Sequence, residues 1–328
     1  MRTTVVFAIL VAALIVSAAA GIFIGAVAIG PGDVLGAFFG ADSTNGTIIR
    51  ELRLPRVLGA ALVGGALAGA GTLLQGLLRN PLADPFVTGT SAGASLGAVI
   101  AVALGASAAI VPLAAFAGAI AAIALVWRLA RIGGGTTVLT VLLAGVVLTS
   151  FAGAVVTLIL VSSDRLALRL RAVLGWLQGG VSVISWSELA VAGVVIAIGV
   201  AAALLLAPRI DAYAFGEETA AALGIDLDRT TGAVLATTAL LTGAAVAIAG
   251  LVGFVGLVIP HALRFVLGAT HRRLLIASFP AGAATLVLAD LGARTMLAPA
   301  ELPVGVITGV VGAPFFLYLL VRSRRVIV

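Results

Sequence analysis

Long stretches without a charged residue dominate this sequence. A helix needs about 20 mostly apolar residues to cross the hydrocarbon core of a membrane. The stretches that reach or approach this length are 5–29, 57–78, 85–127, 138–161, 189–208, 230–263, 274–289 and 302–321. Hydrophobic residues form 62% of the chain and charged residues only 10%, which leaves too little polar surface for a water-soluble protein of this size. The sequence therefore predicts an all-α, polytopic membrane protein.

The number of spans depends on two of these stretches. Residues 85–127 are long enough for two helices with a turn near 105–112, whereas 230–263 is too long for one helix and short for two. We therefore expect about ten transmembrane helices, or nine if 230–263 forms one. The first stretch begins like a signal peptide but stays apolar well beyond Ala20, so we expect it to be retained as a helix.

The charged residues exclude several functions. Every basic residue is arginine, and without lysine the chain has no P-loop for ATP. It has no cysteine and only two histidines, so we expect no thiolate nucleophile, disulfide or metal site. Although the net charge is +6, the arginines lie between apolar runs, which is typical of membrane topology and not of a nucleic-acid partner.

The distribution of arginines predicts that both termini are cytoplasmic. In this orientation two loops have unexpected compositions. The outer loop contains arginines followed by Trp176, which predicts a surface helix over about 165–180. The inner loop, 209–229, is strongly acidic, and topology does not explain an acidic cytoplasmic loop.

An internal repeat is visible when the chain is shifted by 179 residues. This shift aligns 64–83 with 243–262, and eight of the twenty positions are identical, including Gly64 with Gly243 and Pro81 with Pro260. The two copies lie in the second and seventh expected helices and would face in opposite directions. Such inverted repeats are typical of transporters.

Three polar segments each allow two interpretations. Residues 89–93 match the G-x-S-x-G motif of hydrolases, but the glycine spacing within an apolar helix favours close helix packing. Residues 79–85, with two prolines, form either a tight turn or a broken segment that lines a cavity. Asp290 either pairs with Arg294 four residues later or acts as a proton relay, and we favour the pair. We expect His261 and His271 to be polar turn residues.

Arginines also lie at the expected outer ends of two helices. Arg53 and Arg56 flank Pro55, and Arg294 ends another apolar stretch. These side chains either extend to the membrane interface or bind an acidic partner, because the planar guanidinium forms two-pronged pairs with carboxylates. Although most arginines lie on the inner side, the outer side holds more of them than topology alone requires, which favours the acidic partner.

Several segments together resemble one known family. They are 52–56 (LRLPR), 64–75, 80–85 (NPLADP), 215–224, 253–261 (GFVGLVIPH) and 301–305 (ELPVG), followed by 312–316 (GAPFF). In this order, they resemble the FecCD-type permeases, the membrane subunits of ATP-driven importers for ferric siderophores, haem and vitamin B12.

The resemblance implies a single transmembrane permease domain over 1–328 in the inner (cytoplasmic) membrane, in contact with lipid. It implies a homodimer or a heterodimer of related permeases, with a pathway lined by the fifth and tenth helices. Two separate ATPase subunits would bind ATP and Mg²⁺, and an extracytoplasmic binding protein would deliver the cargo. This chain would hold no cofactor and catalyse no reaction. The expected cargo is an iron-siderophore or a related large chelate, moved by alternating access.

The resemblance also implies roles for particular residues. Arg53, Arg56 and Arg294 would dock acidic residues of the binding protein. A cytoplasmic gate would include Asn80 and Leu82, with Thr136 and Thr137 opposite. The loop that couples the permease to the ATPase would contain Glu217, Glu218, Thr219, Ala220, Leu223, Gly224 and Asp226.

Two other classes of function remain open at this stage. An ion-coupled secondary transporter would fit the inverted repeat equally well, but it needs an ionisable residue deep in the membrane. The charge-free stretches offer none at mid-depth. A membrane-embedded enzyme would rest on the motif around Ser91 alone.

Overall fold

The chain forms a bundle of helices. The computed structural model describes residues 2–25, 27, 29–39, 43–132, 137–162, 173–181 and 185–324, and these contain helices but no strand. The helices are α1 (Arg2–Phe23), α2 (Pro31–Phe38), α3 (Thr44–Thr47), the π-helical η1 (Ile48–Arg53), α4 (Leu54–Leu77), the 3₁₀ turn η2 (Pro85–Thr88), α5 (Thr90–Ala103), α6 (Ile110–Ala130), α7 (Val138–Ser162), α9 (Trp186–Tyr213), α10 (Glu217–Ala222), α11 (Leu227–Ala249), α12 (Val255–Leu267), α13 (His271–Thr295) and α14 (Val304–Arg324).

Within the described ranges, seven helical segments are long and apolar enough to cross a membrane, and α5, α12 and the apolar part of α14 are shorter apolar helices. The stretch 85–127 divides into α5 and α6, with the turn where it was expected, and 230–263 divides into α11 and α12. The all-α, multi-span architecture is therefore confirmed. The charge-free stretch 189–208 lies within α9, which continues through Pro208 to Tyr213.

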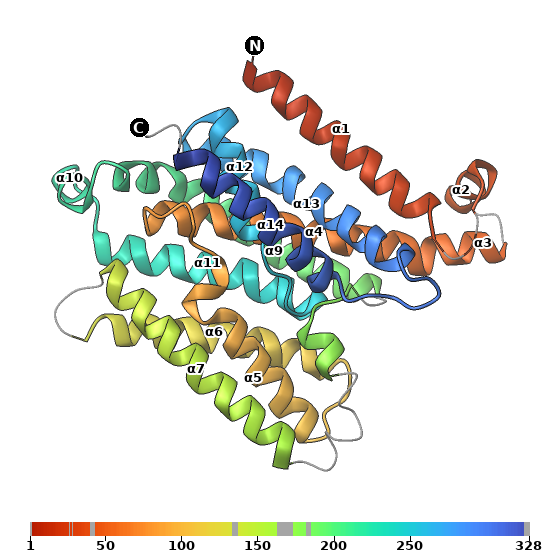
Figure 1. The fold of residues 1–328 in the computed structure, drawn as a ribbon, viewed down its shortest axis with the longest axis horizontal. Coiled ribbons are helices and arrows are strands. Elements are labelled where there is room, and N and C mark those ends of the chain that lie inside the picture. The colour runs from red at the N-terminus through yellow and green to blue at the C-terminus, as the bar shows by residue number, and fades with distance from the viewer. Residues whose placement is uncertain are drawn as a thin grey trace.

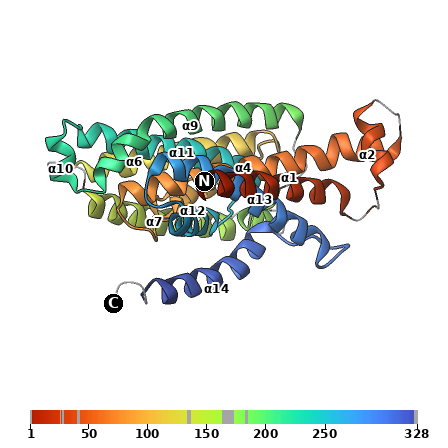
Figure 2. The same cartoon turned by 90° about the horizontal axis from the view of Figure 1, so that it is seen from above.

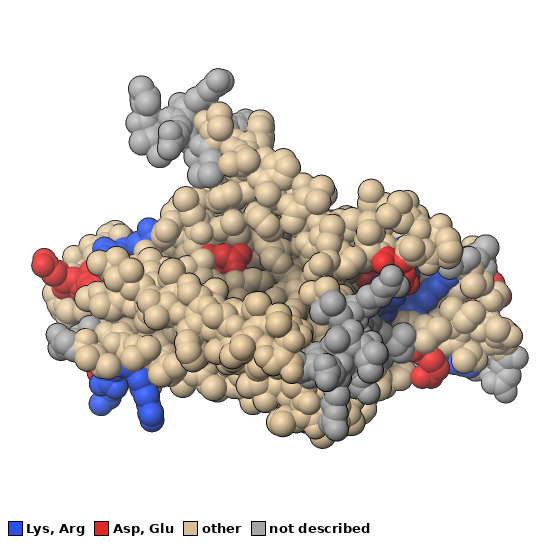
Figure 3. Space-filling model, turned by 60° about the horizontal axis from the view of Figure 1, so that its bottom comes forward, with Lys and Arg blue, Asp and Glu red and all other residues tan. Residues whose placement is uncertain are grey.

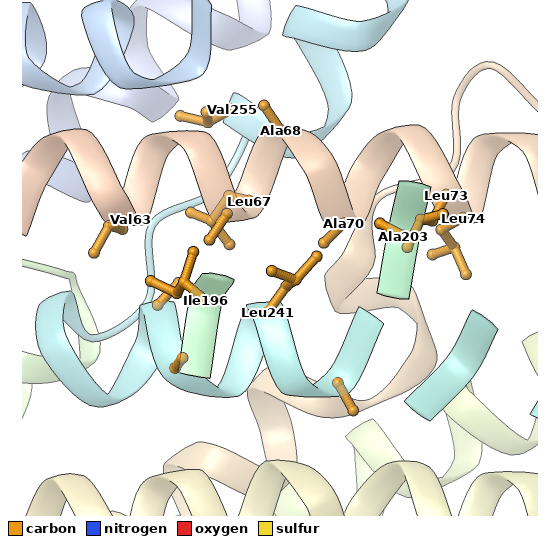
Figure 4. Packing of buried hydrophobic residues seen from close by; sticks show 14 of the residues in the cluster. Val63, Leu67, Ala68, Ala70, Leu73, Leu74, Ile196, Ala203, Leu241 and Val255 are labelled. Atoms are coloured by element: carbon orange, nitrogen blue, oxygen red, sulfur yellow. The ribbon is translucent and has the colours of Figure 1, made fainter. Parts of the chain in front are cut away.

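Helix α4 forms the centre of the bundle. In its apolar window 83% of residues are buried, against 11% for α1 and 17% for α7. Figure 4 shows Leu67 and Leu73 of α4 packed among Ile196 and Ala203 of α9 and Leu241 of α11. The apolar side chains that α1 and α7 leave exposed suit a lipid environment, where exposure of apolar surface has no cost.

Close packing around α4 depends on glycine. A methyl group on Gly64 would overlap the backbone of Gly282 in α13, and one on Gly71 would overlap the carbonyl oxygen of Gly256 in α12. Gly93 in α5 meets Gly118 in α6 in the same way. Small residues allow helix backbones to approach this closely, so the predicted packing role of the glycines around Ser91 is confirmed.

The bundle has two chemically distinct ends. Figures 1 and 2 both place α10 at one end and α2 and α3 at the opposite end. We call these the α10 end and the arginine end, because the latter holds Arg53, Arg56 and Arg294. Helix α14 lies to one side of the other helices in Figure 2.

Contacts between neighbours fix the direction of each helix. Helices α9 and α4 run in the same direction, since Gly193 lies near Leu62 and Ile210 lies near Gly76. Helix α11 runs opposite to α9, because Tyr213 at the end of α9 donates a hydrogen bond to the first residue of α11. Helices α4 and α11 are therefore antiparallel.

Candidate functional site

At the arginine end, the side chain of Arg53 is buried and hydrogen-bonded to backbone carbonyl oxygens. Arg53 is 6% exposed, and its guanidinium donates hydrogen bonds to the carbonyl oxygens of Ile22 and Phe23, the last residues of α1, and of Val27 beyond it. These carbonyls have no helical partner because the helix ends here. The side chain thus anchors the end of α1 against α4.

Arg56 and Arg294 share one buried carboxylate. Asp290, which is 1% exposed, accepts from Arg56 Nε at 3.0 Å and lies 3.0 Å from Arg294 Nε. Arg294 also donates to the carbonyl oxygen of Gly21. On its other edge, Arg56 donates two hydrogen bonds to Glu301, at 3.2 and 3.0 Å. One guanidinium therefore joins a buried carboxylate to an exposed one.

The predicted pair between Asp290 and Arg294 is confirmed. Sequence reasoning missed the second cation on Asp290 and the role of Glu301. The local spacing of four residues reveals the first pair, but Arg56 and Glu301 are 245 residues apart in the chain, so no sequence pattern joins them.

At the α10 end, a short acidic helix projects from the bundle. Helix α10 begins after Gly216, whose φ of +103° favours glycine. Glu217 pairs with Arg79 at 3.4 Å, and Leu223 is 67% exposed. The predicted coupling residues Glu218, Thr219, Gly224 and Asp226 are also exposed, and Ala220 is buried beneath them.

Polar contacts of Tyr213, Asp211 and Asp226 hold the segments next to α10. Tyr213 Oη donates to the carbonyl oxygen of Leu227, which ties α9 to α11. Asp211 accepts from the backbone N–H of His271 at 2.8 Å and contacts its Nδ1 at 2.7 Å. Asp226 caps α11 by accepting from the N–H of Arg229. These contacts therefore fix the two ends of the loop to α9, α11 and α13.

The prediction that both histidines are turn residues is wrong. His271 is the first residue of α13 and is 2% exposed. His261 lies inside α12, 6% exposed, with its ring edge-on to Phe265 and Phe316. Packing against Phe265 and Phe316 buries the ring of His261, and no spacing pattern in the sequence predicts this contact.

The segment after α4 turns back into the bundle. The Asn80 side chain accepts from the N–H of Leu82 at 2.9 Å, which forms a tight turn. The chain then returns until Pro85 contacts Gly256, level with Leu67 in the middle of α4. Gln75 donates to the carbonyl oxygen of Ala83 in this segment, at 3.4 Å, and to that of Leu257 in α12, at 3.0 Å. The segment therefore contains a tight turn and then a return towards α4, with Asp84 in the lining of a cavity, so both interpretations stay open.

A cavity of about 540 Å³ lies beside this segment. Asp84, Ser91, Thr149 and Ser150 are polar residues in its lining, which also includes Phe254. The N–H of Phe86 donates a hydrogen bond to the Asp84 carboxylate at 2.8 Å. In Figure 3 the charged side chains gather towards the two ends, and one acidic group lies in a hollow between them.

The remaining predicted residues fall at the edge of the described chain. Thr137 precedes α7 and exchanges hydrogen bonds with Thr140. Thr136 and the arginines of the predicted surface helix lie outside the described residues, although 173–177 are helical. Leu82 is 40% exposed. Ser91 lies in the first turn of a helix without the strand that a nucleophile elbow requires.

Comparison with known proteins gives a consistent result. The chain is 44% identical to the cobalamin import system permease protein BtuC of Halobacterium salinarum over 88% of its length and 77% of that protein. It is 40% identical to the hemin transport system permease protein HmuU of Yersinia pestis, over 84% of this chain and 83% of that protein. A solved inward-facing structure of a metal-chelate type ABC transporter superposes with a TM-score of 0.84, at 28% identity, covering 97% and 99% of the two chains.

The match to a family extends over almost the whole chain. Residues 10–322 match the FecCD transport family, and the segments that carry the match include both the broken segment after α4 and the loop that bears α10. Family members are components of membrane transport systems and not enzymes. The chain is a multi-pass membrane permease and belongs to the FecCD transport family.

Proposed function

We propose that this chain is the permease subunit of an ATP-driven importer for an iron-siderophore or a related large chelate. The observation that carries the proposal is the loop that bears helix α10. The helix presents acidic side chains, and the exposed apolar residues Phe215 and Leu223 lie just before and just after it. An exposed apolar patch with a polar rim is typical of a protein-binding site. Its occupant would be the ATPase, which holds the ATP and Mg²⁺.

The proposed topology has ten membrane crossings. The seven long apolar helices would be joined by the three shorter ones, α5, α12 and α14. Helices α5 and α12 both begin near the middle of α4, after irregular backbone, as the broken helices of transporters do. The antiparallel directions of α4 and α11 support an inverted repeat, and α10 would mark the cytoplasmic side together with both termini.

The proposed assembly contains two permeases and two ATPase subunits. α14 exposes Val310, Leu317 and Tyr318, and together with α7 it would line the pathway between the two permeases. The cavity beside Asp84 would open into this pathway, with Asn80, Leu82, Thr136 and Thr137 at the cytoplasmic gate. Arg53, Arg56 and Arg294 would lie at the side that receives the binding protein.

Uptake into proteoliposomes tests the proposal. The permease is reconstituted with its ATPase and binding protein, and uptake of a ferric hydroxamate siderophore, haem or cobalamin is measured with internal ATP. We expect uptake of one of these chelates to require ATP and to stop when the catalytic glutamate of the ATPase is changed to glutamine. Uptake that survives this change but falls when a proton ionophore is added would favour an ion-coupled secondary transporter.

Helix α10 should be necessary for coupling. We expect Leu223→Asp to reduce binding of the ATPase about tenfold, because a charge replaces an apolar contact at the centre of the proposed interface. Transport should fall in parallel, while the folded permease remains in the membrane. Affinity is measured by titrating the purified ATPase against permease in nanodiscs.

Leu104→Asp provides the matched control. Leu104 is 78% exposed, follows α5 and lies away from the loop that bears α10. The same change at this position should leave ATPase binding unaltered. If ATPase affinity falls equally in both variants, or does not fall in Leu223→Asp, α10 is not part of the coupling interface.

A further inference from the structure

The guanidinium of Arg56 has two differently placed edges. The inner edge, formed by Nε and Nη2, contacts Asp290, whose residue is 1% exposed. The outer edge, formed by Nη1 and Nη2, donates to both oxygens of Glu301. The Glu301 side chain is 54% exposed. The inner contact fixes the orientation of the guanidinium, and the outer contact faces the surface.

The two carboxylates differ in how firmly they are held. Asp290 lies on α13 and also pairs with Arg294, so losing it would leave Arg294 without a counter-charge and Arg56 with Glu301 alone. Glu301 lies in the non-helical segment between α13 and α14, and Arg56 is its one hydrogen-bond partner among the described residues. Exposed ion pairs contribute little stability and exchange readily with competing ions. The outer contact can therefore be replaced without disturbing the inner one.

The other two arginines at this end have no comparable edge. Arg53 is directed into three backbone carbonyls, and Arg294 is divided between Asp290 and one backbone carbonyl. The Arg294 side chain is 8% exposed, against 14% for Arg56. An incoming carboxylate would have to break buried hydrogen bonds to reach either of them.

We infer that the outer edge of Arg56 is a carboxylate-binding site and that Glu301 is its resident occupant. When the extracytoplasmic binding protein docks, an acidic side chain of that protein replaces Glu301 on the same two N–H groups. Glu301 then swings into solvent, while Asp290 keeps the guanidinium in place. This inference rests on the proposed function, since the acidic partner is the binding protein of the importer.

Exchange has a consequence that simple charge attraction does not have. A resident carboxylate competes with the incoming one, so its removal should strengthen docking. Glu301 also keeps the exposed edge of Arg56 satisfied between docking events, which limits binding of unrelated anions. The net affinity for the partner therefore depends on the difference in binding free energy between the incoming carboxylate and Glu301 at the same guanidinium.

The test measures the affinity of the cognate binding protein for permease in nanodiscs at low salt. Glu301→Gln removes the competing charge with little change in shape, and we expect docking to become roughly fivefold to tenfold tighter. Glu301→Ala should give at least the same gain. The gain should disappear when Arg56→Gln is combined with Glu301→Gln, because the two side chains act through one contact.

Glu51→Gln is the matched control. Glu51 is an exposed carboxylate in η1, only a few residues before Arg56, and it forms no ion pair among the described residues. Its neutralisation changes the net charge of this face by the same amount without touching Arg56. We expect it to change docking by less than about twofold, measured at the same salt concentration.

The outcomes separate the inference from the proposed function. If the binding protein docks to the wild-type permease but Glu301→Gln gains no more than Glu51→Gln, the exchange is refuted and the importer stands. A gain that persists in the Arg56→Gln background also refutes it. If the binding protein does not dock to the wild type at all, the proposed function fails and the inference falls with it.

Discussion

Gly71→Ala is expected to destabilise the permease by about 3 kcal/mol or more. The added methyl group would overlap the carbonyl oxygen of Gly256. The obstacle is backbone and not a flexible side chain, so it cannot move aside through a change of rotamer. Helices α4 and α12 would have to separate, and the Gln75 hydrogen bond to Leu257 would weaken with them. Thermal unfolding in detergent, followed by loss of the monodisperse species, measures the effect.

Gly69→Ala is the control in the same helix. Gly69 is buried like Gly71, but a methyl group there would find only Leu241 nearby, at 3.9 Å, which is an ordinary van der Waals contact. Because alanine is a better helix former than glycine by up to about 1 kcal/mol, this variant should be as stable as the wild type or slightly more so. Similar losses at both positions would show that backbone contact between α4 and α12 is not the cause.

Asp290→Asn is expected to cost about 3–5 kcal/mol of stability, because it leaves the buried Arg294 without a counter-charge and Arg56 with Glu301 alone. Asparagine keeps the size of the side chain, so the loss reports charge and not packing. Stability is measured by thermal or denaturant unfolding of the permease in detergent at neutral pH.

Glu301→Gln serves as the comparison for Asp290→Asn, since both carboxylates contact Arg56. The Glu301 side chain is 54% exposed, and removing its charge should cost at most about 1 kcal/mol. The double variant Asp290→Asn with Arg294→Gln should recover part of the lost stability, because it removes the cation that Asp290→Asn leaves without a counter-charge. Equal costs for the two single variants would contradict the division into a fixed and an exchangeable carboxylate.

The helices follow from the sequence because length and apolarity decide whether a segment can cross a membrane. The division of 85–127 and the pair formed by Asp290 and Arg294 depend on local spacing, and both were predictable. The end of α9 was not, because a proline within a helix is tolerated where neighbouring helices support it. The position of the broken segment along the bundle was not predictable either. Pro81 and Pro85 indicate a break in the helix, but they do not indicate that the chain returns to the middle of α4.

In the candidate site, too, the sequence predicts some features and not others. The arginines at one end and the acidic loop at the other are visible in a chain with so few charges. Their partners are not visible, because Arg56 meets Glu301 across 245 residues and Arg79 meets Glu217 across 138. Burial was equally hidden for Arg53, whose three backbone acceptors follow from the way α1 ends beside η1.

The glycine contacts along α4 have a mechanical consequence. Interlocked side chains resist sliding, because each knob must leave one hole before it enters the next. Where Gly64 faces Gly282 and Gly71 faces Gly256, two nearly smooth backbone surfaces meet instead. We expect lengthwise shifts of α13 against α4 to be limited by the flanking side chains Ala68 and Leu286. Sideways separation of these helices should stay costly, because the contacting atoms of the glycines are backbone.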